Sequence, residues 1–198
     1  YMNSGALNAS KLGVMGSEDL GGGTSALSLA GQLSGPAVAP AVELTLDVEM
    51  ASSRGVTLRR LRGDIRADKQ AFRISAIRAE LGNGDLTGDL HVGLAAEAAS
   101  RATVGWRNVD PTAVLDAAPS DGWIVPATQL SGEVHAEWSG SVPTAADITA
   151  TLLTRFDDTS PTEGRVSLDG RLEAALIAGV WRASVDAVVA GGLRIDVE

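Results

Sequence analysis

The chain has 198 residues, no cysteine, a formal net charge of −9 at pH 7 and an aromatic content of only 4%. The lack of cysteine excludes a disulfide framework and any cysteine-based metal or redox site, and the negative charge argues against general nucleic-acid binding. No stretch approaches the roughly 18 apolar residues of a membrane-spanning helix. Because Leu193–Glu198 still alternates where the sequence stops, we expect a segment of a longer protein.

Residues 1–40 are predicted to be irregular or to form weak strands, since glycine-rich connections occupy 21–25 and 35–40. The clearest strand follows at Val42–Met50, where five apolar residues alternate with Glu43, Thr45, Asp47 and Glu49. Strict alternation over nine residues predicts roughly 30 Å of strand with one apolar and one polar face.

Similar alternation fills most of the remaining chain. Further strands are predicted at Phe72–Leu81, Leu86–Leu94, Ala102–Trp106, Leu130–Trp138, Ile148–Phe156, Val166–Leu176 and Val185–Val189. Gly82–Asp85 contains turn residues that tolerate positive φ and predicts a hairpin. One short helix is expected at 110–118, with Asp110 as its N-cap and Pro111 in its first turn.

The phrase Leu-x-Gly-x-aliphatic occurs five times, beginning at residues 29, 61, 86, 130 and 168. In a strand its first, third and fifth residues share a face. Glycine weakens a strand interior and usually marks a bend, a bulge or a close approach of backbones. We therefore predict an architectural role for five glycines: Gly31, Gly63, Gly88, Gly132 and Gly170.

These patterns predict an all-β protein, a single β-repeat segment over 1–198 with strands at 41–109, a helix and loop at 110–128, and strands at 129–198. One short helix cannot cover so many half-apolar strands. A sandwich and a solenoid remain open, but a curled antiparallel sheet with an apolar trough fits the scarcity of aromatic residues. The expected lining is Val42, Leu44, Leu46, Val48, Val134, Ile148, Leu152, Leu168, Leu172 and Leu176.

Three phrases occur in a characteristic order: Leu81–Leu90, which joins a turn to a strand, Trp106–Pro111, which enters the helix, and Leu130–Gly140. In this order the chain resembles the AsmA/TamB-like proteins of Gram-negative bacteria over most of 25–198. The resemblance implies a β-taco, or elongated β-groove, in the periplasm, within a parent chain anchored in the inner membrane. It also implies a non-enzymatic role in passing phospholipid acyl chains between the two membranes, or in outer-membrane biogenesis together with an outer-membrane assembly protein.

Catalytic signatures are scarce, and we expect no enzyme, cofactor or metal. Glu133, His135 and Glu137 could offer three metal ligands from one strand face, but a solvated strand face is the favoured interpretation. No Gly-x-Ser-x-Gly nucleophile motif is present. The rival function is a structural or adhesive β-repeat module of a secreted or surface protein, with a closed, dry core.

Positive charge is concentrated in residues 54–78, which hold eight basic and two acidic residues, net +6, against −15 for the rest of the chain. Contacts with lipid headgroups or with a partner are possible for Arg59, Arg60, Arg62 and Arg66. A solvated face of two strands is the favoured alternative.

Overall fold

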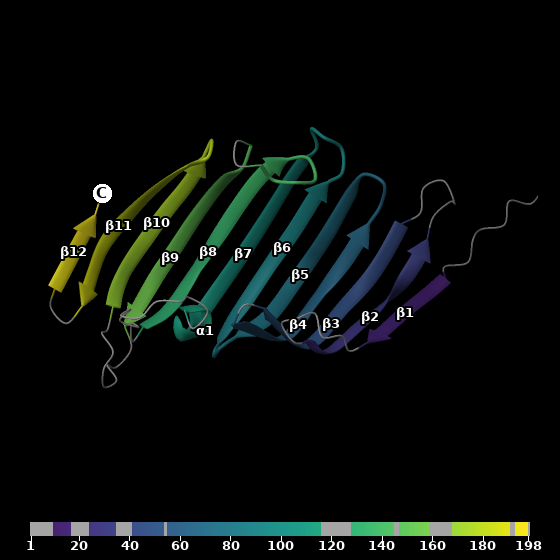
Figure 1. Cartoon of the computed structure of the whole chain (residues 1–198), viewed down its shortest axis with the longest axis horizontal. Helices are drawn as coiled ribbons and strands as arrows, with labels where there is room; N and C mark the ends of the chain where they lie inside the picture. The colour runs from purple at the N-terminus through teal and green to yellow at the C-terminus, as the bar shows by residue number, and fades with distance from the viewer. Residues whose placement is uncertain are drawn as a thin grey trace, which may run out of the picture.

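The computed structural model describes residues 10–16, 24–34, 41–53, 55–115, 128–144, 147–158, 168–190 and 193–197. These residues form one antiparallel sheet in which strands pair in strict chain order (Figure 1). The strands are β1 (Ser10–Gly16), β2 (Thr24–Ser34), β3 (Ala41–Ser53), β4 (Val56–Ala67), β5 (Ala71–Leu81), β6 (Gly84–Gly93), β7 (Ala99–Val109), β8 (Thr128–Ser139), β9 (Thr149–Asp158), β10 (Leu168–Ile177), β11 (Val180–Ala190) and β12 (Leu193–Val197). The helix α1 (Thr112–Leu115) joins β7 to β8.

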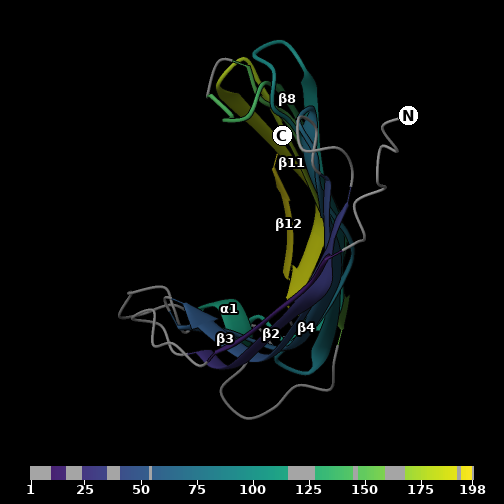
Figure 2. The ribbon, with the colours of Figure 1, turned by 90° about the vertical axis from the view of Figure 1, so that its right-hand side faces the viewer.

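The sheet curls along its strands into an open trough, which has a C-shaped outline when viewed from its end (Figure 2). Within the described residues β1 pairs only with β2, and β12 only with β11, so the sheet is not closed. The prediction of an all-β, curled antiparallel sheet is therefore confirmed. The predicted helix is present at Thr112–Leu115, and residues 116–127 lie outside the described part.

The predicted strands are present, most of them with longer bounds. The Gly82–Asp85 hairpin is also confirmed, because β5 and β6 flank a two-residue turn at Gly82 and Asn83. Gly82 has a φ of 60°, as such a turn requires. Two regular strands, β1 and β2, occupy parts of the region in which weak or irregular structure was expected. Pairing with β3 along ten residues of β2 supplies the order that local sequence does not.

The register places an apolar residue opposite an apolar residue from strand to strand. One such row crosses eleven strands and consists of Leu12, Gly31, Leu44, Ile65, Ile74, Leu90, Ala102, Ala136, Ala150, Leu176 and Trp181. Because side chains alternate between faces, the row defines one continuous apolar face and one polar face.

The apolar face is the concave one. Its side chains are buried or half-buried along β3 to β10, whereas most of those that alternate with them are exposed. The helix α1 lies on the concave side near one lip of the trough (Figure 2). Next to it Val109 is 2% exposed, and Leu81 is 8% exposed at the β5–β6 turn.

Bulges keep the apolar face continuous. Ala76 has a φ of 53° and lies where the β5–β6 register shifts between Ile74 and Ile77. A bulge adds one residue to its strand, so Ile77 points to the same face as Ile74 although the two are three positions apart, an offset that would place them on opposite faces of a regular strand. Asn108, with a φ of 55°, has the same position in the shift between Trp106 and Val109.

Candidate functional site: an apolar trough

The predicted lining residues lie on the concave face but not in one compact pocket. Four of them belong to β3 and three to β10, Val134 and Leu152 face each other on β8 and β9, and Ile148 immediately precedes β9. Seven strand spacings of about 4.8 Å separate β3 from β10, roughly 34 Å. The residues therefore line an elongated surface, which suits an extended ligand better than a compact one.

Most of this surface is only half-buried. Val48 is 4% exposed, whereas Leu44, Leu46, Leu152 and Leu172 are of intermediate exposure. Complete burial of such a side chain stabilises the folded state by about 1.5–3 kcal/mol, so a half-buried side chain contributes only part of that free energy. Among the described residues no second sheet covers the face, and the unsatisfied apolar area is available to a ligand.

Glycine and tryptophan are matched across two strands of the trough. Gly132 on β8 lies opposite Trp106 on β7, and a Cβ atom at Gly132 would approach the Cζ2 atom of Trp106 to 2.8 Å and the Cα atom of Thr154 to 3.0 Å. It would also collide with the carbonyl oxygen of Leu153. The indole therefore occupies space that only glycine leaves free.

The other predicted glycines differ among themselves. A Cβ at Gly88 would come within 2.8 Å of the Thr103 carbonyl oxygen, and one at Gly31 would collide with that of Glu43. Gly170 has a φ of 152° at a register shift, a conformation that favours glycine. At Gly63 the nearest atoms would be 3.4 Å away, an ordinary contact. Close approach of a neighbouring strand therefore requires glycine at Gly31, Gly88 and Gly132, and backbone conformation favours it at Gly170, whereas neither applies at Gly63.

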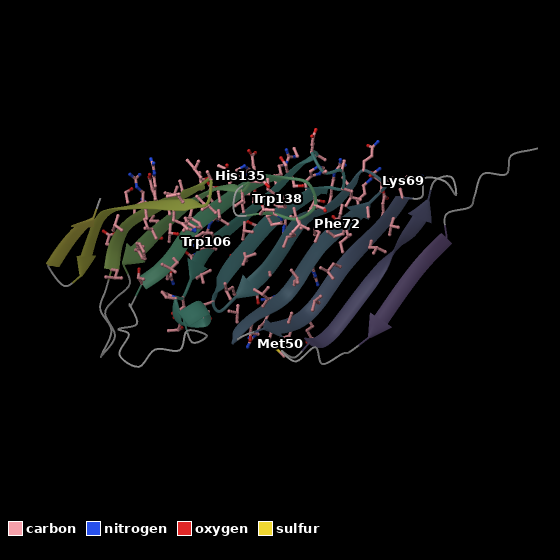
Figure 3. All side chains as sticks on the ribbon, turned by 45° about the horizontal axis from the view of Figure 1, so that its top comes forward. Met50, Lys69, Phe72, Trp106, His135 and Trp138 are labelled. Carbon is pink, nitrogen blue, oxygen red and sulfur yellow. The ribbon has the colours of Figure 1, made fainter. Side chains whose placement is uncertain are left out.

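Buried polar groups fasten one rim of the trough. Ser100, 2% exposed, donates a hydrogen bond to the Gly140 carbonyl at 2.6 Å and accepts one from the Gly93 amide at 2.9 Å. These bonds join the start of β7 to the end of β6 and to the residue that follows β8. Opposite Ser100, Trp138 has a buried Nε1 atom without a hydrogen-bond partner. Figure 3 labels Trp138 together with Trp106 and Phe72.

Three of the four predicted headgroup-contacting arginines are paired with acids on neighbouring strands of the polar face. Arg60 forms an ion pair with Glu80. Two more pairs, both at 3.3 Å, are Arg62 with Asp47 and Arg66 with Glu43. Arg59, on the same strand, is exposed. The pairing of three arginines and the exposure of the fourth support the alternative interpretation, a solvated strand face.

The Glu133–His135–Glu137 stretch also lies on the polar side of its strand. His135 Nε2 lies 3.1 Å from a Glu137 oxygen, and its Nδ1 lies 3.0 Å from the Thr103 hydroxyl. In the part of the chain that the structure describes, no three potential ligands are grouped as a metal site. Hydrogen bonds to neighbouring side chains account for this histidine.

Hollows between side chains occur on the polar face. One is lined by His135, Glu173 and Arg182, and another, of about 480 Å³, by Arg66, Arg73 and Arg101. The second includes basic residues that the sequence patterns did not single out as a group, because only the pairing of β4 to β7 brings them together.

No family model, curated protein or solved structure matches the chain. Within the described ranges, no helix has both the length and the apolar character needed to cross a membrane. The resemblance to the AsmA/TamB-like proteins stays a prediction that rests on the sequence phrases.

Proposed function

We propose that this chain is a non-enzymatic lipid-binding segment whose concave face shields phospholipid acyl chains while they pass along it. The observation that carries the proposal is the unbroken apolar row from Leu12 on β1 to Trp181 on β11, on a sheet that is open along its length. An acyl chain is apolar and extended, and it needs a long surface without charges.

The dimensions of the trough suit this ligand. Twelve strands span eleven spacings of about 4.8 Å, or roughly 50 Å, longer than the hydrocarbon thickness of about 30 Å of a whole bilayer. A phospholipid could therefore lie with its acyl chains in the trough and its headgroup beyond a lip, in water. Several lipids could occupy the trough at once.

As part of the same proposal, the segment works in the periplasm, within a longer chain anchored in the inner membrane. There it moves phospholipid between inner and outer membranes, or supports outer-membrane biogenesis with an outer-membrane assembly protein. Support comes from the resemblance to AsmA/TamB-like proteins and from the open, curled sheet that such proteins are expected to form.

Two consecutive residues of β9 provide a direct test. Leu152 lies on the apolar face opposite Val134, whereas its neighbour Leu153 points to the polar face and is 40% exposed. A photocrosslinking amino acid at position 152 should capture phospholipid in cells that contain the parent protein. The same amino acid at position 153 provides the matched control, with the same strand and the same chemistry.

Capture at 152 but not at 153 would support the lipid conduit. Equal capture at both positions would indicate nonspecific contact with membranes and contradict the proposal. Absence of lipid at 152, with crosslinks to protein instead, would favour the structural or adhesive module with a dry core.

A further inference from the structure

A row of basic side chains crosses the polar, convex face of the sheet, away from the trough. Arg66 on β4 lies opposite Arg73 on β5, Arg73 lies opposite His91 on β6, and His91 lies opposite Arg101 on β7. Directly opposite residues have Cβ atoms only about 4.5–5.5 Å apart. Four residues with basic side chains are thus concentrated on four adjacent strands.

Two of these arginines lack a carboxylate partner. Arg66 is neutralised by Glu43 at 3.3 Å, but among the described residues no carboxylate lies within ion-pair distance of Arg73 or Arg101. Elsewhere on the polar face, carboxylates do pair with arginine, as at Arg155 with Asp157 at 3.7 Å. Arg73 and Arg101 therefore keep positive charge that no ion pair compensates, and this charge favours an added anion.

Three acids lie near Arg73 and Arg101, and each already has another hydrogen-bond partner. Asp89, which also lines the hollow, accepts a hydrogen bond from the Ala76 amide at 3.1 Å. Asp68 accepts bonds from the amides of Gln70 and Ala71 at 2.8 and 2.9 Å. These two acids therefore stabilise a bulge and a turn. Glu137, directly opposite Arg101 on β8, lies 3.1 Å from Nε2 of His135.

His91 is placed between the two unpaired arginines with one ring nitrogen already used. Its Nδ1 atom accepts a hydrogen bond from Nε of Arg73 at 2.9 Å. In the neutral imidazole the proton must then be on Nε2, which is left as a donor. The same bond orients the guanidinium of Arg73 and leaves its terminal N–H groups free to bind a ligand.

We propose that Arg73, His91 and Arg101 form a binding site for a tetrahedral oxyanion of the phosphate class. The two arginines stand on strands either side of His91, with backbones about 9–10 Å apart, so an anion above the imidazole can accept hydrogen bonds from both guanidinium groups. Arginine binds phosphate oxygens in this forked, charge-assisted way. The phosphate can belong to a lipid headgroup or to a soluble phosphate compound, and the site lies on the face opposite the acyl-chain trough.

Inorganic phosphate is the first probe, titrated into the isotope-labelled chain while chloride is adjusted to hold ionic strength constant. We expect saturable chemical-shift changes centred on His91 and Arg73. The substitutions Arg73→Gln and Arg101→Gln should each weaken binding about tenfold or more, as expected for loss of a charge-assisted hydrogen bond. The control is Arg155→Gln, which removes one positive charge from the same face and should leave binding unchanged. Circular dichroism checks that each variant is folded.

Vesicles identify the source of the phosphate. Sedimentation with neutral phosphatidylcholine vesicles that contain phosphatidic acid, lost in Arg73→Gln and Arg101→Gln, would assign the site to a headgroup. Phosphate binding without such sedimentation would assign it to a soluble compound. The proposal is overturned if wild type binds neither probe saturably, or if Arg155→Gln weakens binding as much as the other two substitutions. The titration with inorganic phosphate involves no acyl chains, so its failure leaves the lipid conduit untouched.

Discussion

The contact between Gly132 and Trp106 makes a sharp prediction about stability. Adding a single methyl group in Gly132→Ala places a Cβ atom against the Leu153 carbonyl oxygen, 2.8 Å from Cζ2 of Trp106 and 3.0 Å from Cα of Thr154. Since two of these three atoms belong to the backbone of β9, side-chain rotation alone cannot relieve the overlap. Overpacking of this kind costs about 1–3 kcal/mol.

Gly63→Ala is the matched control, because it adds the same methyl group to the same Leu-x-Gly-x-aliphatic phrase. There the nearest atoms are 3.4 Å away, and a glycine replaced at a compatible site usually stabilises by about 0.4–1 kcal/mol through the unfolded state. With a urea m-value of about 2–3 kcal/mol/M, the two midpoints should differ by roughly 0.5–2 M, Gly132→Ala being the lower.

A double-mutant cycle separates the ring from the backbone. Trp106→Ala removes the indole but leaves the Leu153 carbonyl oxygen in place, so only part of the Gly132→Ala penalty should disappear in the double variant. Equal urea midpoints for Gly63→Ala and Gly132→Ala would refute the idea that close strand approach requires glycine in the trough.

Three further expectations concern other positions in the sheet. The variants Leu46→Glu and Leu172→Glu should remain folded, because a charge on an open face can stay hydrated, but they should no longer allow lipid capture at neighbouring lining positions. Global unfolding of both would favour a dry core, where an unpaired charge costs several kcal/mol. Ser100→Ala should destabilise by about 1–3 kcal/mol, because it leaves the buried Gly93 amide without its acceptor; an unchanged urea midpoint would contradict this. Backbone hydrogen bonds, chiefly from Gln70, hold the pKa of Asp68 below its usual 3.8. The stabilisation by Asp68 relative to Asp68→Asn should therefore be full above that value and should decline as pH falls through the lowered pKa. A difference in unfolding free energy between the two proteins that is the same at pH 7 and pH 2 would argue against it.

Alternation of apolar and polar residues was sufficient to predict the β class and the positions of most strands. In Val42–Met50 the pattern is strict, and it corresponds to β3. Register was harder to predict, because it depends on bulges such as Ala76, where a residue other than glycine takes a positive φ. No local pattern marks that position, since alanine carries no turn signal.

The candidate sites, too, were predictable within a strand but not between strands. That the lining residues share a face follows from the period of two within each strand. The contact of Trp106 with Gly132 depends on how β7 and β8 pair across the 18-residue connection from Asp110 to Ala127, and sequence spacing does not determine that pairing. Likewise, Arg73 and Arg101 are 28 positions apart in sequence, and only the pairing of β6 with β5 and with β7 brings them to either side of His91.

Because the strands pair in strict chain order, each hairpin adds a fixed length to the trough. Every strand contacts its neighbours in sequence, so an inserted or deleted hairpin would lengthen or shorten the trough by about 9–10 Å without reversing the direction of any later strand. Evolution can therefore adjust the reach of such a sheet by tandem duplication, as in other arrays whose stability is the sum of nearest-neighbour terms. The distance that the protein spans is then set by the number of hairpins its gene encodes.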